Sequence, residues 1–187
     1  MKEVVKLRNG EKIIIRHVIE SDIDGIWNNF NEVVDEKIYL PVLFPVKSKF
    51  EKQSWFHNIQ KEREICIVAI HPTMLSPYNI LGQCEISNLE WDAATHVGSL
   101  GVIVQMNFRD LGIGFNLIDK AIRESKRLNK EKIILSSFLD NERALFLYKK
   151  IGFKTTGIRK KQFYMDSVYY DEVLMELWID DYLEKNP

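Results

Sequence analysis

The chain has 187 residues and a formal net charge of −1, and 45% of its residues are hydrophobic and 28% charged. These values are ordinary for a soluble globular protein and fit one domain over residues 1–187. No apolar run is long enough to cross a bilayer and the first residues lack a signal-peptide core, so we expect a cytoplasmic protein. The two cysteines, Cys66 and Cys84, lie in strand-like runs and are expected to be reduced core residues.

The basic residues are concentrated in the second half of the chain. Residues 109–161 contain 14 Lys and Arg against 6 Asp and Glu, whereas residues 1–108 and 162–187 are both net acidic. This pattern favours a polyanionic ligand or a nucleic acid as a partner. A solvated, lysine-rich helix face would produce the same pattern, so charge alone leaves both interpretations open.

The first half of the chain predicts a strand, two helices and three further strands. A β-branched run marks the first strand, and Ser21 is expected to cap the first helix, with Asp22 and Asp24 in its first turn. An apolar run with two prolines predicts a loop over residues 38–46. The expected ranges are 11–17 for the first strand, 21–34 and 47–62 for the helices, and 65–70, 79–89 and 96–104 for the strands.

The second half of the chain alternates helices and strands. Apolar side chains fall on one side of an expected helix over residues 112–129. A second helix, over residues 141–151, is expected to begin at an Asp140-Asn141 cap and to end at Gly152. Hairpins should be antiparallel and strands joined through a helix parallel, which predicts a mixed α/β (α+β) sheet with helices on its faces. The remaining strands are expected at 132–138, near 153–159 and near 168–178.

A glycine-rich turn, Arg109-Asp110-Leu111-Gly112-Ile113-Gly114, lies between the expected strand 96–104 and the helix that follows it. Such a turn directs several backbone N–H groups and the positive end of the helix dipole at one point, which suits a phosphate. A tight turn without a ligand is the alternative. Leu117 excludes a dinucleotide fingerprint, which needs a small residue there, and the tripeptide of a P-loop does not occur.

A second segment identifies a family. Residues 141–153, Asn-Glu-Arg-Ala-Leu-Phe-Leu-Tyr-Lys-Lys-Ile-Gly-Phe, resemble the closing motif Asn-x-x-Ala-x-x-x-Tyr-x-x-x-Gly-Phe of the GNAT superfamily of N-acetyltransferases. Residues 15–22 resemble the opening strand and helix of that family. Residues 170–175 resemble the closing stretch of branches that acetylate ribosomal-protein N-termini or small amines. The resemblance covers nearly the whole chain.

This resemblance implies a fold and an activity. The GNAT fold has a central mixed, mostly antiparallel twisted sheet of about seven strands, about four helices on its faces, and a V-shaped splay between two central strands, here 96–104 and 132–138. The implied enzyme moves an acetyl group from acetyl-CoA to a primary amine, of a small molecule or of a peptide or protein N-terminus, by direct attack in a ternary complex. The alternative is a catalytically weak GNAT domain that binds acyl-CoA as a sensor or scaffold.

The same resemblance implies the cofactor-binding residues. Acetyl-CoA is the implied co-substrate, and its negative charge offers a partner for the basic part of the chain. No metal is expected, because the four histidines lack metal-ligand spacing with each other and with the cysteines. Strand backbone groups would pair with the pantetheine arm, and loop amides would hold the pyrophosphate. The residues implied are Val102, Val104, Arg109, Leu111, Gly112, Ile113, Gly114, Phe115, Asn141 and Tyr148.

Tyr148 and Glu85 are the candidate catalytic residues. Tyr148 matches the general acid of the family, and a phenol can protonate a leaving thiolate because its reference pKa is above that of a thiol. Packing in the core is the alternative role for such an aromatic residue. Glu85 matches a glutamate that many family members use as a base, directly or through water. A solvated glutamate is the alternative, and either water alone or, as a distant second choice, His96 would then accept the proton.

The acceptor pocket is the least defined part of the prediction. The resemblance implies walls formed by residues 38–49 and 160–168. An aromatic lining with a carboxylate would suit a cationic amine, and simple sealing of these loops onto the core is the alternative. Neither a nucleic acid nor a membrane is expected as a partner, and family membership allows a homodimer. The candidate substrate-binding residues are Tyr39, Phe44 and Tyr164, with Phe163 and Asp166 beside them.

Overall fold

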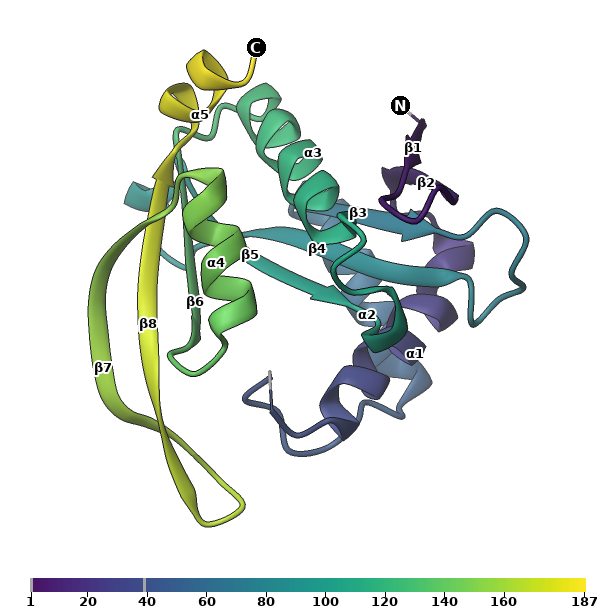
Figure 1. The fold of residues 1–187 in the computed structure, drawn as a ribbon, viewed down its shortest axis with the longest axis horizontal. Coiled ribbons are helices and arrows are strands. Elements are labelled where there is room, and N and C mark those ends of the chain that lie inside the picture. The colour runs from purple at the N-terminus through teal and green to yellow at the C-terminus, as the bar shows by residue number, and fades with distance from the viewer. Residues whose placement is uncertain (1, 39) are drawn as a thin grey trace.

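One twisted sheet runs through the part of the chain that the computed structural model describes, residues 2–38 and 40–187, and it contains eight strands there (Figure 1). Their order is β1-β2-β3-β4-β5-β6-β8-β7, and each neighbouring pair is antiparallel except β5 and β6. β3 is buried at every residue, which explains its continuous apolar sequence. The strands are β1 (Glu3–Lys6), β2 (Lys12–His17), β3 (Ile65–Ile70), β4 (Ile80–Asn88), β5 (Val97–Val104), β6 (Lys132–Phe138), β7 (Lys154–Met165) and β8 (Val168–Trp178).

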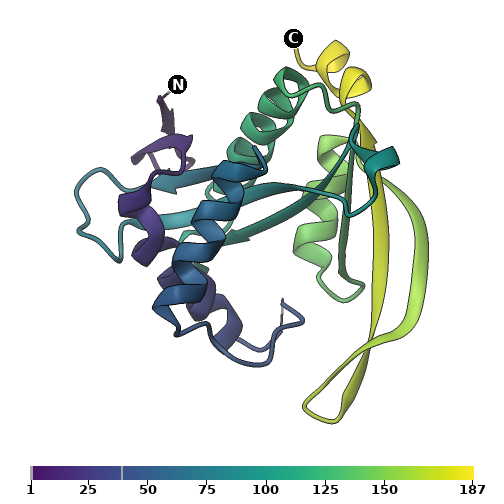
Figure 2. The ribbon, with the colours of Figure 1, turned by 180° about the vertical axis from the view of Figure 1, so that it is seen from behind.

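Five α-helices cover the two faces of the sheet within these described ranges. α3 and α4 lie on the face shown in Figure 1, and α1 and α2 lie on the opposite face, shown in Figure 2. The short α5 follows β8 and contacts α3. Within the described ranges no helix is both long enough and apolar enough to cross a membrane. The helices are α1 (Ile23–Asp35), α2 (Lys49–Lys61), α3 (Ile113–Arg127), α4 (Glu142–Ile151) and α5 (Ile179–Lys185).

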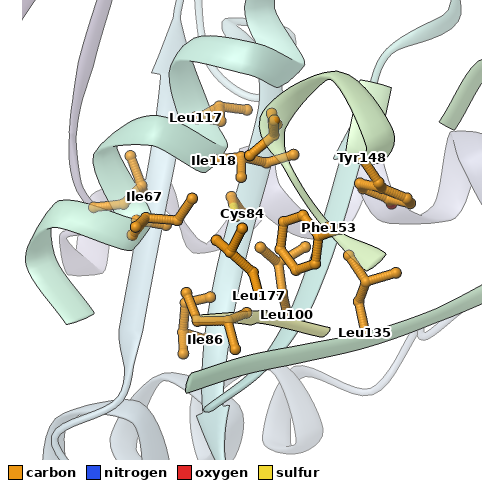
Figure 3. Close-up of a cluster of buried hydrophobic side chains, with 14 of the residues drawn as sticks. Ile67, Cys84, Ile86, Leu100, Leu117, Ile118, Leu135, Tyr148, Phe153 and Leu177 are labelled. Carbon is orange, nitrogen blue, oxygen red and sulfur yellow. The ribbon is translucent and has the colours of Figure 1, made fainter. Parts of the chain in front are cut away.

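Two apolar clusters hold the helices to the sheet. The larger cluster lies under α3 and α4 and includes Leu117 of α3 and Cys84 of β4 (Figure 3). The smaller cluster lies under α1 and α2 and includes Val68 and Ile80. Each fully buried side chain of this size stabilises the fold by about 1.5–3 kcal/mol relative to an exposed one. Cys66 and Cys84 are buried and unbonded to each other, as expected.

The predicted strand directions are confirmed with one exception. β3, β4 and β5 form antiparallel hairpins, and β5 and β6, which α3 connects, are parallel. β2 and β3 are antiparallel although helices connect them, because two helices lie between them and each one reverses the chain. β7 follows β6 through α4 and runs in the same direction, but β8 lies between the two strands and pairs with both.

The structure has one strand and one helix more than the prediction of about seven strands and about four helices. The missing strand is β1, which is only four residues long and has charged residues at both ends. The Asn9-Gly10 pair that follows it is a hairpin signal, and Gly10 has the positive φ of 90° that such a turn requires. The missing helix is α5, which begins directly after β8 with two aspartates in its first turn.

The start of α1 differs from the prediction. A short 3-10 turn, Glu20–Asp22, precedes the helix, and Asp22 rather than Ser21 stands at the N-cap position. The Asp22 carboxylate accepts a hydrogen bond from the N–H of Ile19 at 2.9 Å and pairs with Arg16 of β2 at 2.6 Å. Because Arg16 ties this carboxylate to the sheet, the α-helix begins one residue later than the predicted cap implies.

The expected loop over residues 160–168 is mostly strand. β7 continues to Met165, with an irregularity in its pairing between Arg159 and Phe163. The turn is confined to Asp166 and Ser167, which both have positive φ. β7 and β8 therefore form one long hairpin, which extends past the rest of the sheet in Figure 1.

A bulge in β4 changes the faces of two residues. The pairing with β3 shifts between Ala69 and Ile70, so that Ile80 pairs with Ile70 and Leu81 has no partner there. Leu81 therefore joins the cluster under α3, and Ile80 joins the cluster under α1 and α2. Ile80 and Leu81 therefore depart from the simple alternation of faces that the rest of β4 follows.

Candidate active site

β5 and β6 pair at only one end. Their parallel register covers Val97 to Ser99 of β5 and Lys132 to Ile134 of β6. Beyond that point β5 remains paired with β4 and β6 with β8, so the two central strands diverge. The predicted V-shaped splay is thus confirmed, and a cleft of about 960 Å³ lies at its open end. This cleft is the candidate active site.

The ammonium group of Lys130 secures the closed end of the V. It donates to the carbonyl oxygens of Thr95 and Val97, at 2.7 and 3.0 Å, and to the side-chain oxygen of Asn88 at 2.7 Å. Burial lowers the pKa of Lys130. His96 lies at this same closed end and is exposed, so the structure places this second-choice base away from the open cleft.

The glycine-rich turn of residues 109–114, the predicted phosphate loop, forms one wall of the cleft. Gly112 has φ of 97°, a left-handed conformation that turns the chain into α3. The N–H of Asn116 is the first in α3 to reach a helical acceptor, the Gly112 carbonyl at 3.2 Å. In the described ranges, the N–H groups of residues 112–115 have no hydrogen-bond acceptor. Several free amides at the positive end of a 15-residue helix form an anion site, which fits a pyrophosphate.

Gly114 allows α4 to approach this loop. A Cβ atom at position 114 would lie 3.1 Å from Cδ2 of Leu147, a close contact between the two helices. Both residues line the cleft. The second glycine of the motif therefore sets the spacing of the walls, while the first shapes the turn.

Arg109 is held by contacts within the protein. Its guanidinium group donates to both carboxylate oxygens of Glu36, and its Nε donates to the carbonyl oxygen of Val104 at 2.9 Å. One helical turn before Glu36, Glu32 accepts a hydrogen bond from the side chain of Gln105 at 2.7 Å. Two successive turns of α1 thus hold the segment that leads from β5 into the phosphate loop. Arg109 also lines the cleft, and its contact with a cofactor stays a prediction.

Tyr148 lies in the wall of the cleft on α4. Its ring is buried and meets Phe153 edge-on at 5.9 Å between centroids, and Figure 3 shows Tyr148 at the edge of the larger cluster and Phe153 nearer its centre. Within the described ranges, no residue forms a hydrogen bond with the Tyr148 hydroxyl. Burial, with a smaller contribution from nearby Cys84, raises the pKa of Tyr148. The phenol therefore stays protonated at neutral pH and can donate its proton.

Glu85 lies on the other face of the sheet, under α2. Trp55 Nε1 donates to one carboxylate oxygen at 3.3 Å, and Gln83 Nε2 donates to the other at 3.4 Å. Burial raises the pKa of Glu85, and these two hydrogen bonds partly oppose the rise. Glu85 does not line the cleft, but its partner on β5 is Gly101, which does. A Cβ atom at Gly101 would meet nothing within 4 Å, so there is open space beside this register partner of Glu85.

The structure brings the predicted cofactor residues together and leaves the predicted substrate residues apart. All ten cofactor candidates line the cleft. Asn141 also caps α4 by accepting the N–H of Ala144 at 3.2 Å. Phe163 lines the cleft, but Phe44 and Tyr164 do not and are 78% and 59% exposed. Tyr39 lies outside the described residues. The substrate-binding roles of these three residues stay predictions.

One wall of the cleft was not predicted from the sequence: Lys6 and Arg8 reach it from the β1–β2 hairpin. Leu40 and Pro41, which lie within the expected wall of residues 38–49, also line the cleft. The Asn9-Gly10 turn could have located the hairpin, but only the three-dimensional packing brings it beside the phosphate loop. Within the described residues there is no group of three or more His, Cys, Asp or Glu able to hold a metal ion.

A parallel strand pair that splays open beside free helix amides is an arrangement that suits a phosphate-bearing ligand held between two strands. The Acetyltransferase (GNAT) family model matches residues 33–153 of the chain. An N-alpha-acetyltransferase of Sulfurisphaera tokodaii is 36% identical over 88% of this chain and 93% of that protein. The chain therefore belongs to the GNAT family of N-acetyltransferases.

Two further relatives agree with this assignment. The L-amino acid N-acetyltransferase AaaT of Escherichia coli is 28% identical over 52% of this chain, and the match spans 60% of that protein. A GNAT superfamily phosphinothricin acetyltransferase of Sinorhizobium meliloti, solved in complex with acetyl-CoA, has a TM-score of 0.80 at 16% identity. That likeness covers 93% of this chain and 89% of the other, and it concerns the fold alone.

Proposed function

We propose that this protein transfers the acetyl group of acetyl-CoA to a primary amine, with both substrates bound together so that the amine attacks the thioester directly. The observation that carries the proposal is the cleft between β5 and β6, which has the unbonded amides of α3 and the Tyr148 hydroxyl in its walls. These features meet the need for a phosphate site and a proton donor in one cavity. The acetyl-CoA complex of the Sinorhizobium meliloti structure supports the same ligand.

Acetyl-CoA supplies an activated acyl thioester. The N–H groups of Gly112 to Phe115 would hold its pyrophosphate, because the α3 dipole favours negative charge there. Backbone groups of Val102 and Val104 would hydrogen-bond the pantetheine amides on the side of β5 that β6 leaves open, as an added strand does. The side-chain NH₂ group of Asn141 is available to the same arm, since its oxygen already caps α4.

Two side chains handle the protons in this proposal. Tyr148 would donate to the leaving thiolate, and burial keeps its phenol protonated. Glu85 would accept the proton that the amine loses. Because Glu85 does not line the cleft, a water molecule in the space beside Gly101 would carry this proton. The raised pKa of Glu85 makes its carboxylate a stronger base than an exposed one.

The proposed acceptor is an α-amine, on a small molecule or at a peptide or protein N-terminus. The names of the two curated relatives, N-alpha-acetyltransferase and L-amino acid N-acetyltransferase, support this class. Leu40, Pro41 and Phe163 provide an apolar wall where the cleft meets the loop after α1 and the β7–β8 hairpin. A thiol-release screen over amino acids and short peptides would identify the preferred acceptor.

Calorimetric titration with acetyl-CoA tests the proposal first. The Gly112→Asn and Gly112→Asp variants share size and backbone strain at this left-handed position, and they differ by one negative charge. We expect the native protein to bind, Gly112→Asn to bind less tightly, and Gly112→Asp to lose binding, because its carboxylate would occupy the phosphate site. Failure of the native protein to bind acetyl-CoA would reject the proposed function. Equal affinities of the two variants would reject the phosphate loop as the binding site.

A further inference from the structure

The β1–β2 hairpin packs directly against the phosphate loop. The N–H of Arg8 donates to the carbonyl oxygen of Leu111 at 3.2 Å, and Nη1 of Arg8 donates to the carbonyl oxygen of Asp110, also at 3.2 Å. Leu7, between the two cleft-lining residues Lys6 and Arg8, is buried in the larger apolar cluster. In both Figure 1 and Figure 2 the hairpin lies on the side of α3 opposite to α4. The hairpin is therefore a second, separate wall next to the loop amides.

Within the part of the chain that the structure describes, no carboxylate pairs with the positive charges of this wall. Among the described residues, Lys6 has no ion-pair partner, and the guanidinium group of Arg8 contacts a backbone carbonyl and no carboxylate. Lys6 and Arg8 are both exposed and line the cleft, whereas Leu7 between them is buried. By contrast, the cleft-lining Arg143 of α4 lies 3.3 Å from the carboxylate of Asp110. Two exposed cations beside an anion site indicate a further negative group on the ligand.

Coenzyme A carries such a group. Its pyrophosphate matches the uncharged loop amides, whereas its 3′-phosphate is a separate dianion at the ribose end of the molecule. We propose, on the basis of the acetyl-CoA-dependent function above, that Lys6 and Arg8 bind this 3′-phosphate and make the enzyme select coenzyme A over its 3′-dephospho form. The two hydrogen bonds to the loop hold Arg8 in place before the ligand arrives, which lowers the entropy lost on binding. Lys150 of α4 also lines the cleft, but within the described ranges no hydrogen bond or ion pair fixes its side chain.

The test compares the affinities for coenzyme A and 3′-dephospho-coenzyme A by calorimetry. The native protein should prefer coenzyme A by about tenfold or more, the effect of one or two charge-assisted hydrogen bonds. Arg8→Gln and Lys6→Gln should each reduce this preference, and the double variant should abolish it. All variants should bind the dephospho form as tightly as the native protein does. Lys12→Gln is the matched control, because Lys12 is the exposed register partner of Lys6 and does not line the cleft.

Four outcomes would overturn the inference. Equal native affinity for the two coenzymes would mean that no side chain reads the 3′-phosphate. An equal loss of affinity for both coenzymes in the hairpin variants would mean that Lys6 and Arg8 support the pyrophosphate or the fold. A preference removed by Lys150→Gln and kept in the hairpin variants would assign the 3′-phosphate to α4. If the native protein bound neither coenzyme, the proposed function would fail and this inference with it.

Discussion

Arg109 and Glu36 form a two-point ion pair, with the guanidinium nitrogens 2.7 and 2.5 Å from the two carboxylate oxygens. The pair joins the first residue of the phosphate loop to the C-cap residue of α1. Both side chains are largely buried: that of Arg109 is 13% exposed and that of Glu36 is 8% exposed. The Nε of Arg109 also holds the carbonyl of Val104, the last residue of β5. Arg109 thus positions the phosphate loop between β5 and α3, independently of any contact that it makes with a ligand.

Breaking this pair should destabilise the protein strongly. Glu36→Gln or Arg109→Gln alone leaves a buried charge without its partner, which typically costs about 3–5 kcal/mol. The double variant should lose less than the sum of the single losses, because neither charge remains. Urea denaturation of the four proteins measures this coupling. The exposed pair of Lys126 and Asp180 is the control, and Asp180→Asn should cost about 1 kcal/mol or less. Additive losses at Glu36 and Arg109 would show that the pair is not coupled.

Replacement of Tyr148 by phenylalanine should separate chemistry from binding. The ring would keep its packing against Phe153, so the affinity for acetyl-CoA and the melting temperature should change little. The turnover number should fall by about 10²–10⁴-fold, the usual contribution of a general acid. Because burial raises the pKa of Tyr148, the native enzyme should not lose activity from ionisation of this phenol as the pH rises to 9. Unchanged turnover in Tyr148→Phe would assign the residue to the core alone.

Replacement of Glu85 by glutamine should have opposite effects on stability and on activity. Burial raises its pKa in the folded protein, so the folded state binds a proton more tightly than the unfolded state does. The stability linked to that proton is fully present below the unfolded pKa, about 4.3, and is lost as the pH rises through the folded value. Above that pH the Glu85 carboxylate is ionised in the folded protein, and its burial then lowers the free energy of unfolding. Glu85→Gln should therefore raise the free energy of unfolding at pH 7 and flatten its dependence on pH.

The same substitution should lower activity if Glu85 is the base. Only the ionised carboxylate accepts a proton, so native kcat/KM should fall as the pH drops through the raised pKa of Glu85. Glu85→Gln should remove this acidic limb and reduce the rate at neutral pH. Glu64→Gln, which changes a neighbouring carboxylate that contacts Asn88, is the control. An unchanged pH profile in Glu85→Gln would leave water as the proton acceptor.

The candidate cofactor residues that the sequence indicated all line the cleft, whereas the candidate substrate residues Phe44 and Tyr164 do not, for physical reasons. The phosphate loop and α4 are local features, in which the required glycines, cap and aromatic residue lie within a few residues of one another. Gly112 is left-handed and Asn141 caps α4, as their positions in the sequence indicate. The splay of β5 and β6 depends on the pairing of four strands that lie far apart in the chain. Local sequence patterns therefore do not indicate it, and only the family resemblance implied it.

The residues around the proposed acceptor site are set by strand pairing and by the packing of hairpins, which the local sequence does not determine. The bulge in β4 arises from its pairing with β3, and β7 continues as a strand to Met165 because β8 pairs with it. Phe44 and Tyr164 are aromatic residues in the expected segments, yet neither lines the cleft and both are exposed. Arg8 lies more than 100 residues before the loop that it contacts, and only the packing of the hairpin reveals Arg8 and Lys6 as cleft-lining residues.

Gly101 provides a test of the path between Glu85 and the cleft. It is the register partner of Glu85, it lines the cleft, and a Cβ atom there would meet nothing within 4 Å. Gly101→Ala and Gly101→Val should therefore fold normally, and valine also suits a strand better than glycine does.

Both substitutions should fill the space where the amine and its water are proposed to lie. We expect the KM for the amine to rise in the order Gly, Ala, Val, by about tenfold or more for valine, equivalent to about 1.4 kcal/mol. Acetyl-CoA affinity, measured by calorimetry, should change much less, because the proposed phosphate contacts lie on the loop. A parallel loss of acetyl-CoA affinity would instead place the pantetheine arm over Gly101.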